Sequence, residues 1–160
     1  MKITLGEWRA IGTVAVDAES QLVLPPPPPG PGAYRLRVLG EAPSVYVGSA
    51  DNVAARFEAY RPPGPASSTA RRMIDEIRDT IWNHQHVPVE ICVEGWIEVG
   101  TCREPLDLAD RSSRLLAAVA AADEARAAGF GRVEELGAEV DDLPAGETPA
   151  GETPAGETPA

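Results

Sequence analysis

The chain has 160 residues and a formal net charge of −11, with 43% hydrophobic and 24% charged residues. This length suits one folded domain with additional segments. The sequence has no apolar run of the ~20 residues that a membrane-spanning helix needs, so we expect no membrane partner. Its beginning turns polar too early for a secretory signal, and its two cysteines lack metal-ligand spacing. We therefore expect a cytoplasmic protein.

The negative charge is concentrated near the C-terminal end. Residues 133–160 contain eight carboxylates and no basic residue, which leaves a net charge of −3 for residues 1–132. In residues 30–72, six arginines outnumber three carboxylates. Because Lys and Arg supply much of the affinity for nucleic-acid phosphates, this basic region fits a nucleic-acid partner. A solvated surface without a ligand is the alternative.

In chain order, the first predicted elements are short strands within residues 1–24, where apolar and polar residues alternate in short bursts. Five prolines at 25–29 lack N–H donors and favour polyproline II, so we expect a stiff connector there. A ligand for a proline-binding domain is the alternative. Residues 33–39 and 44–48 predict a hairpin whose turn contains Gly and Pro.

Three helices and a further strand are predicted after the hairpin. The helices are expected near residues 53–60, 68–83 and 108–128, and the half-buried strand is expected over 87–99. The order of these elements predicts an α+β fold. Its core would be a small three-stranded antiparallel sheet flanked by helices, with extra N-terminal strands.

The sequence predicts three regions along the chain. Residues 1–29 hold the N-terminal strands and the polyproline linker, residues 30–132 form the main domain, and residues 133–160 form an acidic tail. Between 144 and 158, the sequence Pro-Ala-Gly-Glu-Thr occurs three times. Because these repeats lack large apolar side chains to offset the ordering entropy, we expect the tail to be disordered. Its charge would then shield the basic region when no ligand is bound.

Tyrosines and one arginine form the most distinctive pattern. Tyr34 and Tyr46 lie on the two strands of the predicted hairpin, and Arg56 and Tyr60 share a face of the next predicted helix at i, i+4 spacing. A guanidinium pairs with phosphate oxygens, and a phenol whose pKa is lowered by a cation activates water. The set therefore indicates phosphodiester chemistry, with packing of the tyrosines in the core as the alternative.

The tripeptides Gly-Ala-Tyr at 32–34 and Tyr-Val-Gly at 46–48, followed by Arg56 and Tyr60, resemble the motifs of the GIY-YIG endonuclease family. The resemblance extends over about residues 30–130. It implies that family's small α+β fold and a nucleic acid as the partner, with DNA as the first expectation. It also implies catalytic roles for Tyr34, Tyr46, Arg56 and Tyr60. In the same basic region we expect Arg61, Arg71 and Arg72 to contact phosphates.

The family holds Mg²⁺ or Mn²⁺ through a glutamate on its third helix. The resemblance places that position at Ala117 or Ala118, where this chain has no side-chain oxygen for a hard cation. Glu124 is the candidate metal ligand that follows, but it lies ~10 Å further along the helix axis than Ala117. Cleavage with Mg²⁺ or Mn²⁺ through an unusual ligand, and phosphate binding without cleavage, both stay open. A protein-interaction module that uses the polyproline segment and the acidic tail is the alternative, with a protein as partner.

Overall fold

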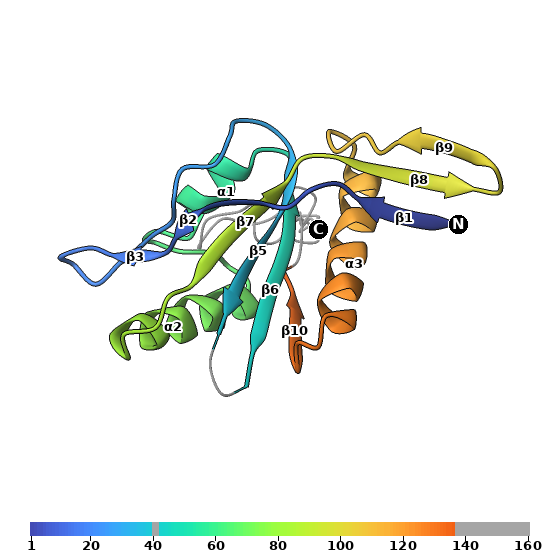
Figure 1. Ribbon diagram of the computed structural model, residues 1–160. Coiled ribbons are helices and arrows are strands. Elements are labelled where there is room, and N and C mark those ends of the chain that lie inside the picture. Colours follow the sequence, from blue (N-terminus) through green and yellow to red (C-terminus); the bar gives the residue numbers. More distant parts are fainter. Residues whose placement is uncertain (40–41, 137–160) are drawn as a thin grey trace, which may run out of the picture.

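The computed structural model describes residues 1–39 and 42–136. Within these residues, ten strands and three helices form a mixed α and β structure, shown in Figure 1. The α+β class predicted from the sequence is therefore confirmed. In the same part of the chain, no helix combines the length and the hydropathy that crossing a membrane requires.

The central sheet has five strands in the order β10-β6-β5-β7-β2. Neighbouring strands are antiparallel except for β10, which runs parallel to β6. The three predicted strands therefore form the antiparallel core β6-β5-β7, and the sheet is wider than predicted because β2 and β10 extend its two edges. The bounds of these strands are β2 (Arg9–Thr13), β5 (Gly32–Val38), β6 (Ser44–Ala50), β7 (Pro88–Cys92) and β10 (Arg132–Glu135).

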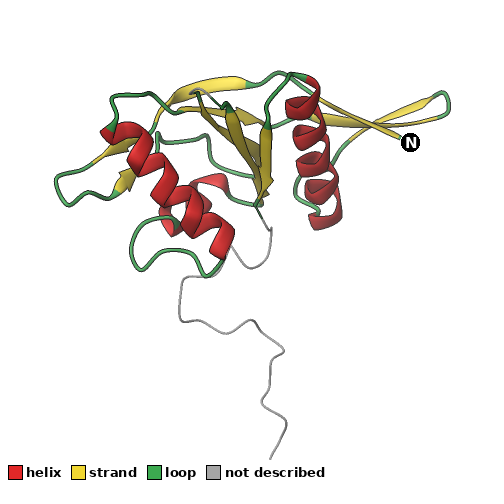
Figure 2. Cartoon of the chain, turned by 90° about the horizontal axis from the view of Figure 1, so that it is seen from below, coloured by secondary structure: helices red, strands yellow, loops and turns green. Residues whose placement is uncertain are grey.

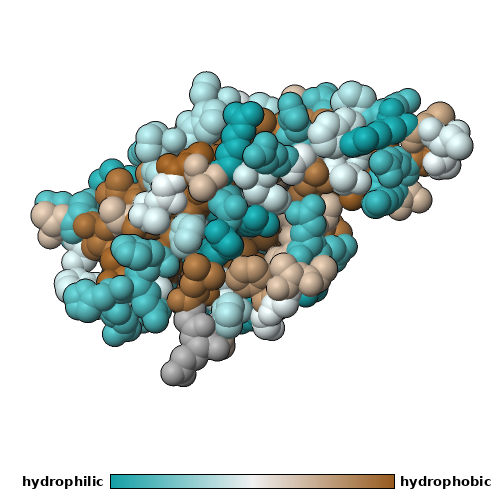
Figure 3. Space-filling model, viewed as in Figure 1, coloured by the Kyte–Doolittle hydropathy of each residue, from teal (hydrophilic) through white to brown (hydrophobic). Residues whose placement is uncertain are grey.

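Two smaller sheets accompany the central one. The first has the order β1-β8-β9 and protrudes to one side of the molecule, where hydrophilic and hydrophobic residues both reach the surface (Figures 1 and 3). The second pairs β3 with β4. The bounds are β1 (Lys2–Leu5), β8 (Gly95–Val99), β9 (Cys102–Pro105), β3 (Ala15–Val16) and β4 (Leu22–Val23).

The single strand predicted over 87–99 is in fact two strands, β7 and β8, which belong to different sheets. The chain leaves β5 after Cys92 and takes β1 as its next partner, and the Gly6 N–H donates to the Glu94 carbonyl at 2.9 Å at this change. Apolar and polar residues continue to alternate across the change. The sequence pattern therefore does not reveal that the pairing partner is exchanged.

The predicted helices are present with their ends shifted by a few residues. They are α1 (Val53–Ala59), α2 (Ser68–Trp82) and α3 (Arg111–Ala127). Each begins after a residue whose side-chain oxygen accepts a hydrogen bond from a first-turn N–H, as N-caps do. The three capping residues are Asn52, Ser67 and Asp110.

The helices cover opposite faces of the central sheet. Successive residues of a strand point to opposite faces, and accordingly Tyr34 and Tyr46 pack with residues of α1 and α2, while Ala33 and Val47 pack with α3. Figures 1 and 2 show α3 on one side of the sheet and α1 and α2 on the other. We call these sides the tyrosine face (Tyr34, Tyr46) and the α3 face (Ala33, Val47).

The folded part of the chain extends into the region predicted as tail. The prediction that the tail begins at residue 133 is wrong for residues 133–136, because β10 pairs with β6 and the Leu136 N–H donates to the Val47 carbonyl at 2.8 Å. Leu136 is only 4% exposed, so its burial offsets the cost of ordering this segment. The Pro-Ala-Gly-Glu-Thr repeats lie outside the described residues.

Residues 1–29 are continuous with the main domain. Strand β2 forms one edge of the central sheet, and β1 pairs with β8. The prolines at 25–29 lie between β4 and β5, in neither a helix nor a strand. Strands β1 and β2 are thus part of sheets formed with later residues, whereas β3 and β4 pair with each other.

Candidate functional site

Three of the four predicted catalytic residues meet on the tyrosine face. The hydroxyls of Tyr34 and Tyr60 lie 2.6 Å apart in a hydrogen bond, and Arg56 Nη1 donates to the Tyr34 hydroxyl at 3.0 Å. Tyr34 has no exposed surface, and Arg56 and Tyr60 are 2% and 3% exposed. The structure therefore brings the guanidinium and two phenols together, inside the core and not on an open surface.

The glycine of the second tripeptide gives the ring of Tyr34 its place. Tyr34 of β5 lies opposite Gly48 of β6. A methyl group on Gly48 would lie 2.6 Å from the Tyr34 hydroxyl oxygen and 2.7 Å from its Cζ. Because such contacts are far inside van der Waals distance, the Tyr34 ring can lie across β6 only where the strand has no side chain.

We expect Gly48→Ala to lower the free energy of unfolding by about 1–3 kcal/mol, the usual effect of overpacking a core. The Tyr34 ring is buried and bonded to Arg56, so it cannot move aside without breaking contacts. Urea unfolding measures the change. Gly131→Ala is the matched control, because a methyl group there meets no heavy atom within 4 Å. Equal stability of the two variants would contradict the close approach of Tyr34.

Phe57 fixes both phenols from the side of α1. Its ring contacts Tyr34 edge-to-face at 5.2 Å between centroids, and it lies nearly parallel to the Tyr60 ring at 6.4 Å. Phe57 is 5% exposed. It is one of the residues that the predicted site did not include, although its place on the apolar stripe of the predicted helix gave a signal for its burial.

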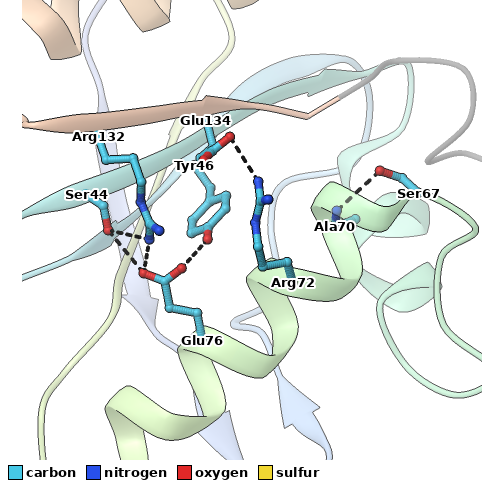
Figure 4. A network of polar contacts seen from close by, with 8 residues as sticks. All are labelled: Ser44, Tyr46, Ser67, Ala70, Arg72, Glu76, Arg132 and Glu134. Atoms are coloured by element: carbon cyan, nitrogen blue, oxygen red, sulfur yellow. Dashed lines mark hydrogen bonds and ion pairs between the residues drawn. The ribbon is translucent and has the colours of Figure 1, made fainter.

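Tyr46, the fourth predicted catalytic residue, lies on the same face in a separate network. It is opposite Leu36, two residues along β5 from Tyr34, so the two tyrosines are diagonal neighbours on the sheet. The Tyr46 hydroxyl donates to Oε2 of Glu76 on α2. Arg132 of β10 donates to Oε1 of the same carboxylate, as Figure 4 shows.

Glu76 therefore joins α2 to two strands, and the sequence interpretation did not single it out. Ser44 of β6 also donates to its Oε1, at 3.4 Å. A signal for Glu76 exists in the sequence, because it lies on the stripe of α2 that contains Met73 and Ile77, both of them fully buried. A carboxylate in such a stripe needs a polar partner within the fold.

The environment of Tyr46 makes it a hydrogen-bond donor. Burial of the ring, the hydrogen bond to Glu76 and the negative charge of Glu76 all raise the pKa of the Tyr46 phenol above its usual value of about 10. Tyr46 is therefore protonated at neutral pH. The role of activating water, which the resemblance implies for Tyr34 or Tyr46, does not suit Tyr46 in this arrangement.

The three arginines expected to contact phosphates lie at the surface, each with a protein partner. Two of the contacts are ion pairs, and the arginine side chains in these pairs are 43% and 56% exposed. Exposed ion pairs generally contribute ~0–1 kcal/mol, so an incoming phosphate can replace such partners. The contacts are Arg61 with Asp17 at 3.3 Å, Arg71 with the Ala66 carbonyl at 3.2 Å, and Arg72 with Glu134 at 3.2 Å.

A cavity of about 270 Å³ lies beside α1, and Arg56 forms part of its wall. Arg56 thus contacts the buried Tyr34 and is at the same time one of the residues that border a space a ligand can occupy. The remaining lining residues are Asp51, Asn52, Ala55 and Ala59.

The residues considered for a metal on α3 lie on the other face of the sheet. Ala117 is fully buried in the cluster of the α3 face, and Ala118 is 8% exposed. Glu124 accepts a hydrogen bond from Trp8 Nε1 at 2.9 Å. None of these positions belongs to the tyrosine face. In residues 1–39 and 42–136, no group of three or more His, Cys, Asp or Glu residues is arranged to hold a metal ion.

The carboxylate bonded to a predicted catalytic tyrosine is Glu76, and its contacts do not fit a resident Mg²⁺ or Mn²⁺. Such ions need free oxygen lone pairs from carboxylates, carbonyls or water. Tyr46 and Arg132 each engage one oxygen of Glu76, and the positive charge of Arg132 opposes a second cation at the same place.

No family model, curated protein or solved structure matches this chain. The interpretation of the site therefore depends on its own geometry. Two arrangements on the tyrosine face carry that interpretation: Arg56 between a phenol and a cavity, and Glu76 between Tyr46 and Arg132.

Proposed function

We propose that this protein is a divergent GIY-YIG-type domain that binds a nucleic-acid phosphate in the cavity beside Arg56. The observation that carries the proposal is the place of Arg56, whose guanidinium donates to the Tyr34 hydroxyl and which is one of the residues lining the cavity. The order of β5, β6 and α1, with a tripeptide motif on each strand, supports the family resemblance. The antiparallel core β6-β5-β7 supports it as well.

Arg56 is the part of the cavity wall that suits a phosphodiester, whereas Asp51 adds a carboxylate to the same wall. A guanidinium offers several N–H donors in one plane, a geometry that matches phosphate oxygens. The hydroxyls of Tyr34 and Tyr60 bond to each other, so one O–H of this pair is used there and at most one is left to donate to the same group. Hydrogen bonds are stronger in a low-dielectric interior, and Arg56 is only 2% exposed although it borders the cavity. The exposed Arg61, Arg71 and Arg72 would then contact neighbouring phosphates of a DNA strand.

Binding without cleavage is the form of the proposal that the contacts favour. Hydrolysis needs a group that activates water, and usually a divalent ion that stabilises the developing charge. Tyr46 is held protonated, and Glu76 is paired with Arg132. Neither residue is therefore prepared for these tasks. Cleavage with Mg²⁺ or Mn²⁺ would require Glu76 to be released from Arg132 first.

Fluorescence anisotropy with a labelled DNA duplex, and with the same strand alone, tests the proposal at low salt. We expect Arg56→Met to weaken binding at least about tenfold, which corresponds to ~1.4 kcal/mol, because Met keeps the apolar stem and removes every donor. Arg126→Met is the matched control, since it removes the same charge from α3, where Arg126 is 51% exposed. Its affinity should stay within about twofold, or ~0.4 kcal/mol.

Two results would overturn the proposal. One is absence of DNA binding by the natural chain at low salt, and the other is equal binding by Arg56→Met and the natural chain. Circular dichroism and urea unfolding of both variants establish that they are folded. A supercoiled-plasmid assay with Mn²⁺ separates binding from cleavage, because nicking by the natural chain that Arg56→Met lacks would identify an active nuclease.

A protein-interaction module is the second candidate. The observation that favours it is the exposure of Pro26, Pro28 and Pro29 in the segment between β4 and β5. Polyproline II segments with exposed prolines are ligands for aromatic-lined grooves. If the natural chain fails to bind DNA, this candidate replaces the first.

A further inference from the structure

The Glu76 carboxylate is held by donors from two neighbouring strands. Arg132 of β10 and Ser44 of β6 donate to Oε1, and the Tyr46 hydroxyl donates to Oε2. The carboxylate itself comes from α2, and its side chain is 26% exposed. Figure 4 shows the Arg132 side chain extending toward α2 alongside Tyr46 and Ser44.

The register of β10 accounts for the position of Arg132. This strand runs parallel to β6 with Arg132 beside Ser44 and Glu134 beside Tyr46. The guanidinium carbon of Arg132 lies 5.9 Å from the centre of the Tyr46 ring, close enough for a cation–π contact. Arg132 is therefore placed by main-chain pairing, and its charge lies where it meets both the Glu76 carboxylate and the tyrosine.

A second pair of charges joins the same two elements. Arg72 of α2 contacts Glu134 of β10 at 3.2 Å. Together with the Arg132–Glu76 pair, it connects α2 to two positions of β10 that lie on the same side of the strand. The Arg132–Glu76 contact is thus part of the packing of β10 against α2.

We propose that Arg132 is the resident cation of the Tyr46–Glu76 site and excludes divalent metal ions from Glu76. Arg132 keeps its charge at every accessible pH, because a guanidinium does not deprotonate in proteins. Its guanidinium donates to Oε1 of Glu76, an oxygen that the ion would need as a ligand, and its positive charge repels the ion. Phosphate binding at the neighbouring Arg56 cavity then needs no metal, and this consequence rests on the proposed function. The exclusion of metal from Glu76 does not rest on the proposed function.

Mn²⁺ broadening of amide signals in the full-length ¹⁵N-labelled chain tests the exclusion directly. Mn²⁺ removes the signals of nuclei close to it, so we follow the amides of residues 44–46 and 75–77. We expect these signals to persist in the natural chain and to be lost in Arg132→Gln at the same Mn²⁺ concentration. They should return in the double variant Arg132→Gln with Glu76→Gln.

Arg72→Gln is the matched control, since it breaks the neighbouring ion pair and leaves Glu76 paired with Arg132. Its signals at residues 44–46 should persist as in the natural chain. Broadening that arises from the carboxylates of residues 137–160 would be the same in all forms. Arg132→Met, which keeps the stem of the side chain, replaces Arg132→Gln if that variant does not give a folded spectrum.

Two outcomes would overturn the inference. In the first, the natural chain loses the signals of residues 44–46 on addition of Mn²⁺ and Glu76→Gln retains them, so Glu76 binds metal despite Arg132. In the second, neither Arg132→Gln nor Arg132→Met loses these signals, so Arg132 is not what keeps the ion away. No DNA is present in this experiment, and its result is therefore independent of whether the Arg56 cavity binds a phosphate.

Discussion

Ala117→Glu is expected to lower the free energy of unfolding by about 4 kcal/mol or more. Ala117 is fully buried on the α3 face, in a cluster that includes Ala33 and Val47. A glutamate there would place a carboxylate among apolar side chains and would also exceed the space of the alanine. Urea unfolding of the variant and the natural chain measures the loss, and failure to fold is the extreme form of the same result.

The matched control is Val119→Glu on the same helix, because Val119 is 50% exposed. Substitutions at exposed positions usually change stability by less than about 0.5 kcal/mol. Equal stability of the two variants would contradict the packing of α3 against the sheet. The pair also tests the family alignment, since Mn²⁺-dependent nicking that appears in Ala117→Glu would mean that this position reaches the tyrosine face.

The order of the three helices and of the core strands β5, β6 and β7 could be predicted, but the face that each helix covers could not. Ala117 lies on α3, the third predicted helix, which follows β7, β8 and β9. The sequence of α3 shows mainly alanines, and small residues allow close packing without indicating a partner. The structure places that helix against Ala33 and Val47, the residues next to the tyrosines in the chain but on the opposite face of the sheet.

Sequence reasoning missed β10, whose partner is distant in the chain, and also β9, which pairs with the preceding strand β8. Residues 132–135 pair with β6, almost 90 positions earlier in the chain, and the acidic residues from 133 onward predict a tail. A short segment of this kind becomes a strand through its neighbour and not through its own propensity. The change of partner between β7 and β8 was invisible for the same reason.

The residues of the candidate site also differ in whether the sequence could predict them. Tyr34, Arg56 and Tyr60 could be found because they lie within a short stretch of the chain, where the spacing of the motifs predicts that their side chains are close together. Glu76 and Arg132 are 56 positions apart and meet through the packing of β10 on α2. No local pattern relates them, although the charge of Glu76 on a buried stripe signals that some partner exists.

Phe57→Ala is expected to lower the free energy of unfolding by about 3–5 kcal/mol, the usual range for truncating a buried phenylalanine. Phe57 is 5% exposed and contacts the rings of both Tyr34 and Tyr60. The variant loses the burial of the ring and leaves a cavity between α1 and the sheet. Urea unfolding, followed by tryptophan fluorescence, measures the change.

Phe130→Ala is the matched control, since Phe130 is the other phenylalanine of the chain and is only partly buried, on the α3 face. We expect a smaller loss there, because less apolar area returns to water. A loss at Phe130 as large as that at Phe57 would contradict this ranking.

The two variants should also differ in DNA affinity if the Arg56 cavity binds phosphate. Only Phe57→Ala frees the Tyr34 and Tyr60 rings to move, and the hydroxyls beside Arg56 are then no longer held 2.6 Å apart.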